Sequence, residues 1–389
     1  SKEIPSYIDA FFETVSGFTT TGATILADVE ALSRGMLFWR GFTHWIGGMG
    51  ILVFVVMLVN PPDRSINILK AEMPGPTVDK LVPKSKDTAR TLYIIYTALT
   101  ALEVIFLLLG GMSLFDSVVH ALSTAGTGGF GAYNASAANF SPYIQWVLTV
   151  FMFLFAINFN LFYLILLGRM RDVFRNTEFR VYLAIVLVSV AVITAEIMPL
   201  YRTFSDSLRQ AAFQVASIIS TTGFITADFT VWTPLSKVLL LGLMFVGGCA
   251  GSTAGGLKVS RVAILFKMMR RELRHTLRPR VVDVIKMDGR RLDEQTAHSV
   301  AVYFALYILS IAVLIVSLSF SRFDLETNLF AAISCFNNVG PGFGMAGPVG
   351  NYSPYPPLFK LLLSAGMLLG RLEIYPMLLL FMPAAWRKR

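Results

Sequence analysis

The sequence has few charged residues, cysteines and histidines, and each shortage excludes a class of protein. Charged side chains make up 15% of the 389 residues and hydrophobic ones 55%, whereas a soluble domain is usually about one quarter charged. A chain this apolar could not cover its surface in water, so a soluble globular protein is excluded. The two cysteines, Cys249 and Cys335, are too few for a disulfide framework, and neither they nor the four scattered histidines have metal-site spacing.

Catalytic motifs are also missing. We find no H-E-x-x-H segment and no pairing of a nucleophile with a base, so we expect no enzymatic activity. The run GSTAGG at 251–256 has the outline of a phosphate-binding loop, but Leu257-Lys258-Val259 follow where Lys-Ser/Thr is required. We therefore expect no organic cofactor in this chain.

Long hydrophobic runs are abundant, and they predict an all-α integral membrane protein. Such runs are typical of bilayer-spanning helices. They are 36–60, 91–111, 143–168, 181–200, 235–257, 299–320 and 358–383, of which 36–60 is a weaker case because it contains Arg40 and His44. The net charge of +9 is concentrated in alternate connections, which the positive-inside rule places in the cytoplasm. That distribution reflects topology, and we expect no nucleic-acid partner.

Four stretches rich in glycine and hydroxyl groups recur along the chain. They read SGFTTTGATI at 16–25, STAGTGGFGA at 123–132, STTGFITADF at 220–229 and NNVGPGFGMA at 337–346. Aligning one glycine from each (Gly22, Gly128, Gly223 and Gly340) gives spacings of 106, 95 and 117 residues, which indicates an internal repeat.

A short amphipathic segment precedes each stretch, at 8–16, 115–124, 207–219 and 325–336. Each is too short to cross ~30 Å of hydrocarbon, so we expect re-entrant pore helices, with caps near Asp9, Asp116, Ser207 and Thr327. Irregular backbone at membrane depth must be buried or line water. Its carbonyls, with threonine hydroxyls, can then replace the hydration shell of a monovalent cation.

The chain resembles the TrkH/KtrB family of potassium-translocating subunits, most closely its TrkH branch. The segments FFETVSGFTTTGATI, STTGFITADF, SCFNNVGPGFG and LLGRLEIYPMLLLF carry the resemblance. It implies four covalently linked helix–pore helix–helix repeats around a pseudo-fourfold pore, here 1–66, 67–175, 176–285 and 286–389. It also implies a filter that holds K+ and is formed by Thr20, Thr21, Gly22, Thr127, Gly128, Thr221, Thr222, Gly223, Asn338, Val339 and Gly340.

Family members carry an outer helix before the first signature, whereas this chain begins just before it. We therefore expect a truncated or incompletely resolved N-terminus.

The third repeat contains a glycine cluster, FVGGCAGSTAGGLKVSR, at 245–261. Each glycine inside a helix costs roughly 1 kcal/mol relative to alanine, so we expect the helix to break. Close packing through small residues is the alternative, but the resemblance implies an intramembrane gate beneath the filter. The expected gate residues are Gly247, Gly248, Cys249, Ala250, Gly251, Ser252, Thr253, Ala254, Gly255, Gly256 and Arg371.

Arg371 lies within the last hydrophobic run, where a charge is costly and usually functional. The resemblance places it in the pore, holding carbonyls or hydroxyls of 249–255. Glu373 is two residues away, so we expect it to pair elsewhere. Glu103 and Glu196 are open between a structural polar contact and a role in conduction.

Two further polar or glycine-rich places have less specific interpretations. For WIGGMGILV at 45–53 we favour helix packing. Asn158 and Asn160 are open between lining a cavity and contacting another helix.

The resemblance predicts a homodimer in a bacterial inner membrane, regulated by a cytoplasmic ring of nucleotide-binding subunits of the TrkA type. The basic loop 267–291 is the expected docking segment, with binding to anionic membrane lipids as the alternative. We expect a pore-forming subunit for K+ uptake. The alternative is an alternating-access cation symporter, which would show two inverted halves.

Overall fold

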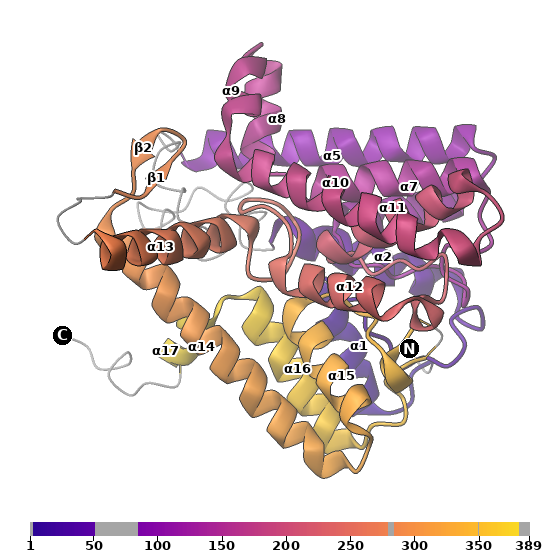
Figure 1. Cartoon of the computed structure of the whole chain (residues 1–389). Helices are drawn as coiled ribbons and strands as arrows, with labels where there is room; N and C mark the ends of the chain where they lie inside the picture. The colour runs from indigo at the N-terminus through magenta and orange to yellow at the C-terminus, as the bar shows by residue number, and fades with distance from the viewer. Residues whose placement is uncertain (1–2, 51–84, 279–283, 349, 381–389) are drawn as a thin grey trace.

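The structure, a computed structural model, describes residues 3–50, 85–278, 284–348 and 350–380 (Figure 1). Within these ranges the chain is helical apart from its connections and one two-stranded hairpin. The α-helices are α1 (Tyr7–Phe18), α2 (Arg34–Met49), α5 (Ser85–Leu109), α6 (Leu114–Ala125), α7 (Pro142–Phe155), α8 (Phe159–Leu166), α9 (Met170–Arg175), α10 (Thr177–Ile197), α11 (Phe204–Ile219), α12 (Pro234–Val246), α13 (Val259–Leu277), α14 (Glu294–Leu318), α15 (Leu325–Asn337), α16 (Pro357–Arg371) and α17 (Ile374–Leu380). The 3-10 turns are η2 (Met198–Leu200), η3 (Phe229–Val231), η4 (Ser319–Ser321) and η5 (Gly344–Ala346), and the strands are β1 (Lys286–Met287) and β2 (Arg290–Arg291).

Among the described residues, three helices are long and apolar enough to cross a membrane: Ala89–Leu109, Thr177–Leu200 and Glu294–Ser321. A fourth span results if α7 and α8 count as one, although they are bent by 93°. The run predicted to span the membrane at 143–168 is therefore not one continuous helix. The Asn158 side chain accepts a hydrogen bond from the Asn160 N–H at 2.9 Å and so caps a new helix at the bend.

Two other predicted spans are also interrupted. The run 235–257 stops as a helix at Val246, which confirms the break expected from its glycines. The run 358–383 divides into α16 and α17 around Leu372 and Glu373. The part of 36–60 beyond Gly50 and the predicted repeat boundary at residue 66 lie outside the described residues.

The four short helices predicted before the glycine stretches are present as α1, α6, α11 and α15. Their N-caps differ from those expected. The capping side chains are Ser6, Ser113, Thr203 and Asp324, and each accepts from the N–H three residues later. The predicted caps are wrong because those residues lie in the first helical turn, where the free N–H groups are the donors.

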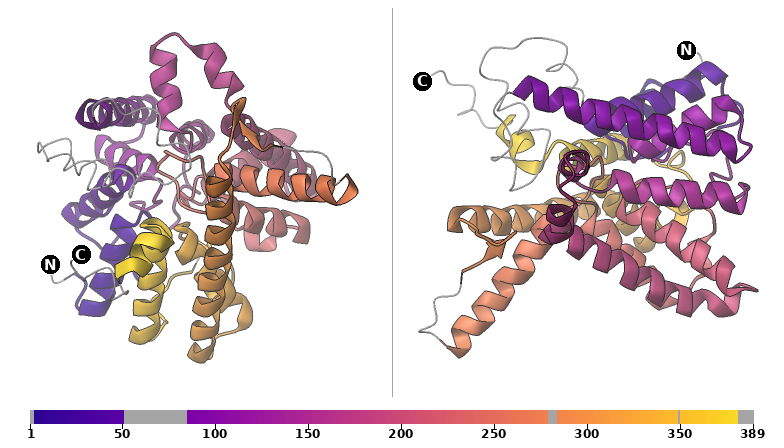
Figure 2. Two further views of the ribbon diagram at one scale, coloured as in Figure 1. Left: turned by 90° about the vertical axis from the view of Figure 1, so that its left-hand side faces the viewer. Right: turned by 90° about the horizontal axis from the view of Figure 1, so that it is seen from above.

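These short helices pack in a closed cycle. Each one contacts the helix that follows it and also one further helix from elsewhere in the chain. The pairs are α1 with α2 and α16, α6 with α7 and α2, α11 with α12 and α7, and α15 with α16 and α12. The long helices α5, α10 and α14 pack outside α6, α11 and α15, and Figure 2 shows the helices arranged about a common centre.

The basic segment 267–291 is not a simple loop. Its first part belongs to α13, and its last part forms the hairpin β1–β2, in which Lys286 pairs with Arg291. The Asp288 carboxylate accepts the N–H of Thr177 at 2.6 Å, which fastens the hairpin to the start of α10. In Figure 1, α13 and the hairpin extend from one end of the molecule.

The cap of α15 gives a test of stability against pH. Hydrogen bonds from the side chain and backbone of Thr327 lower the pKa of Asp324 below its usual 3.8. A carboxyl group whose pKa is lower in the folded than in the unfolded state stabilises the fold at pH values above its unfolded pKa. This stabilisation is lost as the pH falls through the folded pKa. We expect Asp324→Ala to lower the unfolding free energy by about 1 kcal/mol at neutral pH.

Thermal unfolding in detergent between pH 3 and pH 7 would measure this effect. Asp324→Asn is the matched control, because it keeps an acceptor but loses the titration. An unchanged melting temperature for Asp324→Ala would contradict the capping role.

Candidate functional site: a ring of four backbone necks

The backbone beyond each short helix has one repeated conformation. A residue other than glycine with positive φ comes first, and a glycine with positive φ comes two residues later. The first residues are Thr20 (54°), Thr127 (54°), Thr221 (58°) and Asn338 (56°), and the glycines are Gly22 (77°), Gly129 (78°), Gly223 (81°) and Gly340 (97°). We call the segments 20–22, 127–129, 221–223 and 338–340 the four necks.

This conformation corrects the alignment of the second stretch. Gly129, rather than Gly128, is equivalent to Gly22. In the sequence TGG either glycine fits the pattern, and only the backbone angles distinguish them. Gly128 is glycine for another reason, because a Cβ there would lie 2.3 Å from the ring of His44.

The necks contact one another in a closed cycle. A Cβ added at each positive-φ glycine would collide with a carbonyl oxygen of the next neck. The distances are 1.9 Å from Gly22 to Gly128, 2.0 Å from Gly129 to Thr222, 2.1 Å from Gly223 to Val339 and 2.6 Å from Gly340 to Thr21. Four segments far apart in sequence therefore converge on one centre, and the absence of side chains lets them approach.

Side-chain hydrogen bonds reinforce the ring. The amide of Asn338 donates to the Thr21 hydroxyl at 2.9 Å, which joins the fourth neck to the first. The Tyr352 hydroxyl donates to the carbonyl of Gly340 at 2.8 Å. A cavity of about 110 Å³ lies against the connections that follow the necks, and all four positive-φ glycines line it.

The loop 247–258, which separates α12 from α13, packs directly against the ring. Its Gly255 N–H donates to the Thr221 hydroxyl at 2.7 Å. Its Cys249 N–H donates to the Ala156 carbonyl, at the α7–α8 bend, at 2.9 Å. Close packing is also present, because a Cβ on Gly255 would lie 2.4 Å from the Asn337 carbonyl oxygen. The segment is thus a loop held against the third neck, in which small residues are required.

Arg371, at the end of α16, binds this loop. Its guanidinium donates to the carbonyl of Thr253 at 2.7 Å and to those of Gly47 and Gly48 at 2.7 and 2.8 Å. The contact expected with 249–255 is therefore present at Thr253. The two glycine carbonyls of α2 were not anticipated, although the packing expected there is confirmed, since a Cβ on Gly47 would lie 2.1 Å from the Phe18 carbonyl oxygen.

Glu373 pairs elsewhere, as expected. Its carboxylate binds Arg261 at 2.7 Å, and both side chains are largely buried. The Arg261 guanidinium also lies 3.9 Å from the ring centre of Tyr303. Because Arg261 belongs to α13, this pair joins the basic helix to the break that follows Arg371.

Glu178 is a residue of this site that the sequence did not single out. One of its carboxylate oxygens accepts the N–H of Ala250 at 2.7 Å and that of Ser260 at 3.0 Å. It thus joins the loop 247–258 to the first turn of α13. Its sequence signal was an acid three residues before the predicted span 181–200. Glu103 is fully buried and Glu196 partly exposed, and both remain candidates for a structural contact or a role in conduction.

The fold and the ring together define a multi-pass membrane protein whose centre is made of backbone rather than catalytic side chains. The sequence profile of the TrkH family, described as a cation transport protein, matches residues 1–388. The chain therefore belongs to the TrkH family. It is a transport protein of the bacterial inner membrane and not an enzyme.

Relatives and a solved structure agree over nearly the whole chain. The "Trk system potassium uptake protein TrkH" of Escherichia coli K12 is 38% identical, covering 98% of this chain and 80% of that protein. The corresponding protein of Salmonella typhimurium is also 38% identical, with the same coverage. The crystal structure of "the Potassium Transporter TrkH from Vibrio parahaemolyticus" superposes with a TM-score of 0.88 at 34% identity, covering 98% of this chain and 80% of that one.

Glu178 gives a test of how the loop is held. Glu178→Ala leaves two buried N–H groups without their acceptor, and an unsatisfied buried donor costs about 1–3 kcal/mol. We expect a lower melting temperature and faster hydrogen exchange at residues 250–260, measured by mass spectrometry. Glu178→Gln keeps a carbonyl acceptor, so its melting temperature and exchange rate should lie between those of Glu178→Ala and the wild type. Wild-type exchange in Glu178→Ala would exclude the anchoring role.

Proposed function

We propose that this chain is the pore-forming subunit of a potassium uptake system. The named relatives are potassium uptake proteins, and the observation that carries the proposal is the closed ring of four necks. We infer four repeats with the boundaries given above, one neck in each. A ring of carbonyl and hydroxyl oxygens suits a dehydrated monovalent cation.

The cation supported best is K+. The short helices end at the necks, so the partly negative ends of their dipoles favour a cation there. The proposed ligands are the filter residues named from the sequence, with Gly129 added. The second positive-φ position of every neck is glycine, which in this family favours potassium.

We further propose that 247–256 and Arg371 form the gate. The loop hydrogen-bonds to the third neck, and the Arg371 guanidinium links it to α2. A fixed positive charge below the ring raises the barrier for cations. Releasing Arg371 from Thr253 would free the loop and move that charge.

Regulation is assigned to partners. We propose a homodimer and a cytoplasmic nucleotide-binding ring of the TrkA type that docks on α13 and the β1–β2 hairpin. Arg270 and Arg274 of α13 and the hairpin residues Lys286, Arg290 and Arg291 are exposed. The Arg261–Glu373 pair connects α13 to the segment after Arg371. Anionic lipid bound at the same surface is the alternative.

Ion flux in liposomes under K+, Na+ and H+ gradients tests the proposal. We expect K+ movement down its gradient at a rate above that of a carrier cycle, without fixed coupling. A constant stoichiometry with H+ or Na+ would instead support the alternating-access symporter.

The filter assignment predicts the effect of adding a side chain. Gly22→Ser and Gly223→Ser would push apart necks that leave no room for a Cβ. We expect the K+/Na+ permeability ratio to fall roughly tenfold, equivalent to ~1.4 kcal/mol. Gly242→Ser is the control, because a Cβ at Gly242 in α12 meets nothing within 4 Å. Unchanged ratios in both neck variants would count against the filter.

The gate assignment predicts higher flux in the closed condition. Arg371→Ala removes the bonds to Thr253 and α2, and deletion of 249–254 removes the obstruction itself. We expect a several-fold rise in K+ flux without the partner for either change. Arg169→Ala, which breaks an exposed ion pair with Asp172, serves as control. No rise in either variant would exclude the gate.

A further inference from the structure

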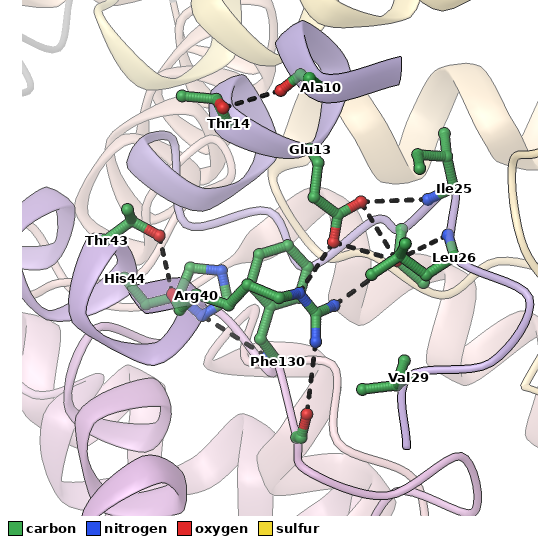
Figure 3. A network of polar contacts seen from close by, with 12 residues as sticks. Ala10, Glu13, Thr14, Ile25, Leu26, Val29, Arg40, Thr43, His44 and Phe130 are labelled. Carbon is green, nitrogen blue, oxygen red and sulfur yellow. Dashed lines mark hydrogen bonds and ion pairs between the residues drawn. The ribbon is translucent and has the colours of Figure 1, made fainter. Parts of the chain in front are cut away.

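A buried ion pair lies behind the first neck, between Glu13 of α1 and Arg40 of α2. The guanidinium Nε lies 2.9 Å from the Glu13 Oε1, and the side chains are 5% and 4% exposed. Figure 3 shows that both point toward the chain that leaves the neck. Neither residue belongs to the proposed filter or to the gate.

The carboxylate holds the outer end of the first neck. Glu13 accepts the Thr24 hydroxyl at 3.0 and 3.1 Å and the Ile25 N–H at 3.1 Å. Thr24 and Ile25 follow Gly22 by two and three residues. The carboxylate therefore fixes the direction in which the chain leaves the ring (Figure 3).

The guanidinium reaches across to the second neck. Arg40 lies 3.9 Å from the ring centre of Phe130 and donates to the Gly131 carbonyl at 3.4 Å. These two residues directly follow Gly129. The pair thus joins the outer ends of two adjacent necks, at the place where Gly22 and Gly128 are in contact.

Charge explains why the residues occur together. Arg40 lines the cavity beside the four glycines, and an unpaired guanidinium there would repel an approaching cation. Glu13 neutralises it while the planar fork still supplies several donors. The positions seven residues before the other three necks are occupied by His120, Gln214 and Ala331, so an acid at this position is peculiar to the first neck.

We propose that Glu13 and Arg40 are positioning residues for selectivity: together they set the separation of the first and second necks at the outer end of the filter. The inference rests on the proposed potassium pore. It predicts that weakening the pair relaxes K+/Na+ discrimination while the ring glycines stay intact.

The test uses permeability ratios in liposomes, which do not depend on the number of active molecules. We expect Glu13→Gln and Arg40→Met each to lower the K+/Na+ ratio on the order of tenfold, because hydrogen bonds to charged groups are the strong ones. Arg40→Lys keeps the charge but loses the planar guanidinium, so its K+/Na+ ratio should lie between those of the wild type and Arg40→Met. Asp9→Asn is the matched control, because it breaks the other α1 ion pair, with Lys360.

Either single variant leaves a buried charge unpaired and can fail to fold. The double variant Glu13→Gln/Arg40→Met removes both charges, and thermal unfolding checks its fold. A wild-type ratio in the folded double variant, or in Arg40→Lys if the double variant does not fold, overturns the inference. Gly223→Ser is measured alongside. If it lowers the ratio and the pair variants do not, only this inference fails, whereas an unchanged ratio in Gly223→Ser argues against the filter itself.

Discussion

The structure depends on one steric constraint: four carbonyl oxygens occupy the places where four Cβ atoms would be. At each neck a glycine with positive φ lies against the backbone of the next neck. Irregular backbone is tolerated inside a membrane only where protein or water surrounds it. The cyclic arrangement meets this requirement, because each neck is covered by its neighbour.

The elements around the ring follow from that constraint. A short helix can deliver its C-terminal end to the centre only if other helices cover its sides, and each short helix does pack against the helix that follows it and against another from elsewhere in the chain. Polar contacts differ from neck to neck. An ion pair supports the first, while the fourth uses the Asn338 amide and the Tyr352 hydroxyl. The ring is therefore similar in backbone but asymmetric in its supports.

Around the loop 247–258, charged side chains bind backbone groups or one another. Arg371 binds three carbonyl oxygens, Glu178 binds two N–H groups, and Arg261 pairs with Glu373. Each charged side chain thus satisfies backbone or an opposite charge in a region where unpaired groups are costly. These contacts hold the loop 247–258 between α7, α10, α16 and the third neck.

Much of the fold could be predicted because its signals are local. Hydrophobic length identified the long helices, and glycine and hydroxyl composition located the necks. The five glycines of 247–256 predicted the break after α12. The local signals also misled: TGG did not distinguish Gly128 from Gly129, and the apolar run 143–168 concealed a bend of 93°.

By itself the sequence determined that the chain belongs in a membrane, where its helices lie and which stretches cannot be ordinary helix. Composition and periodicity act over a few turns, so they suffice for these conclusions. Only the tertiary structure decided which neck touches which, that Glu13 meets Arg40, and that Arg371 reaches α2. Such contacts join residues from different helices, and backbone carbonyls, which every residue carries, leave no trace in the sequence.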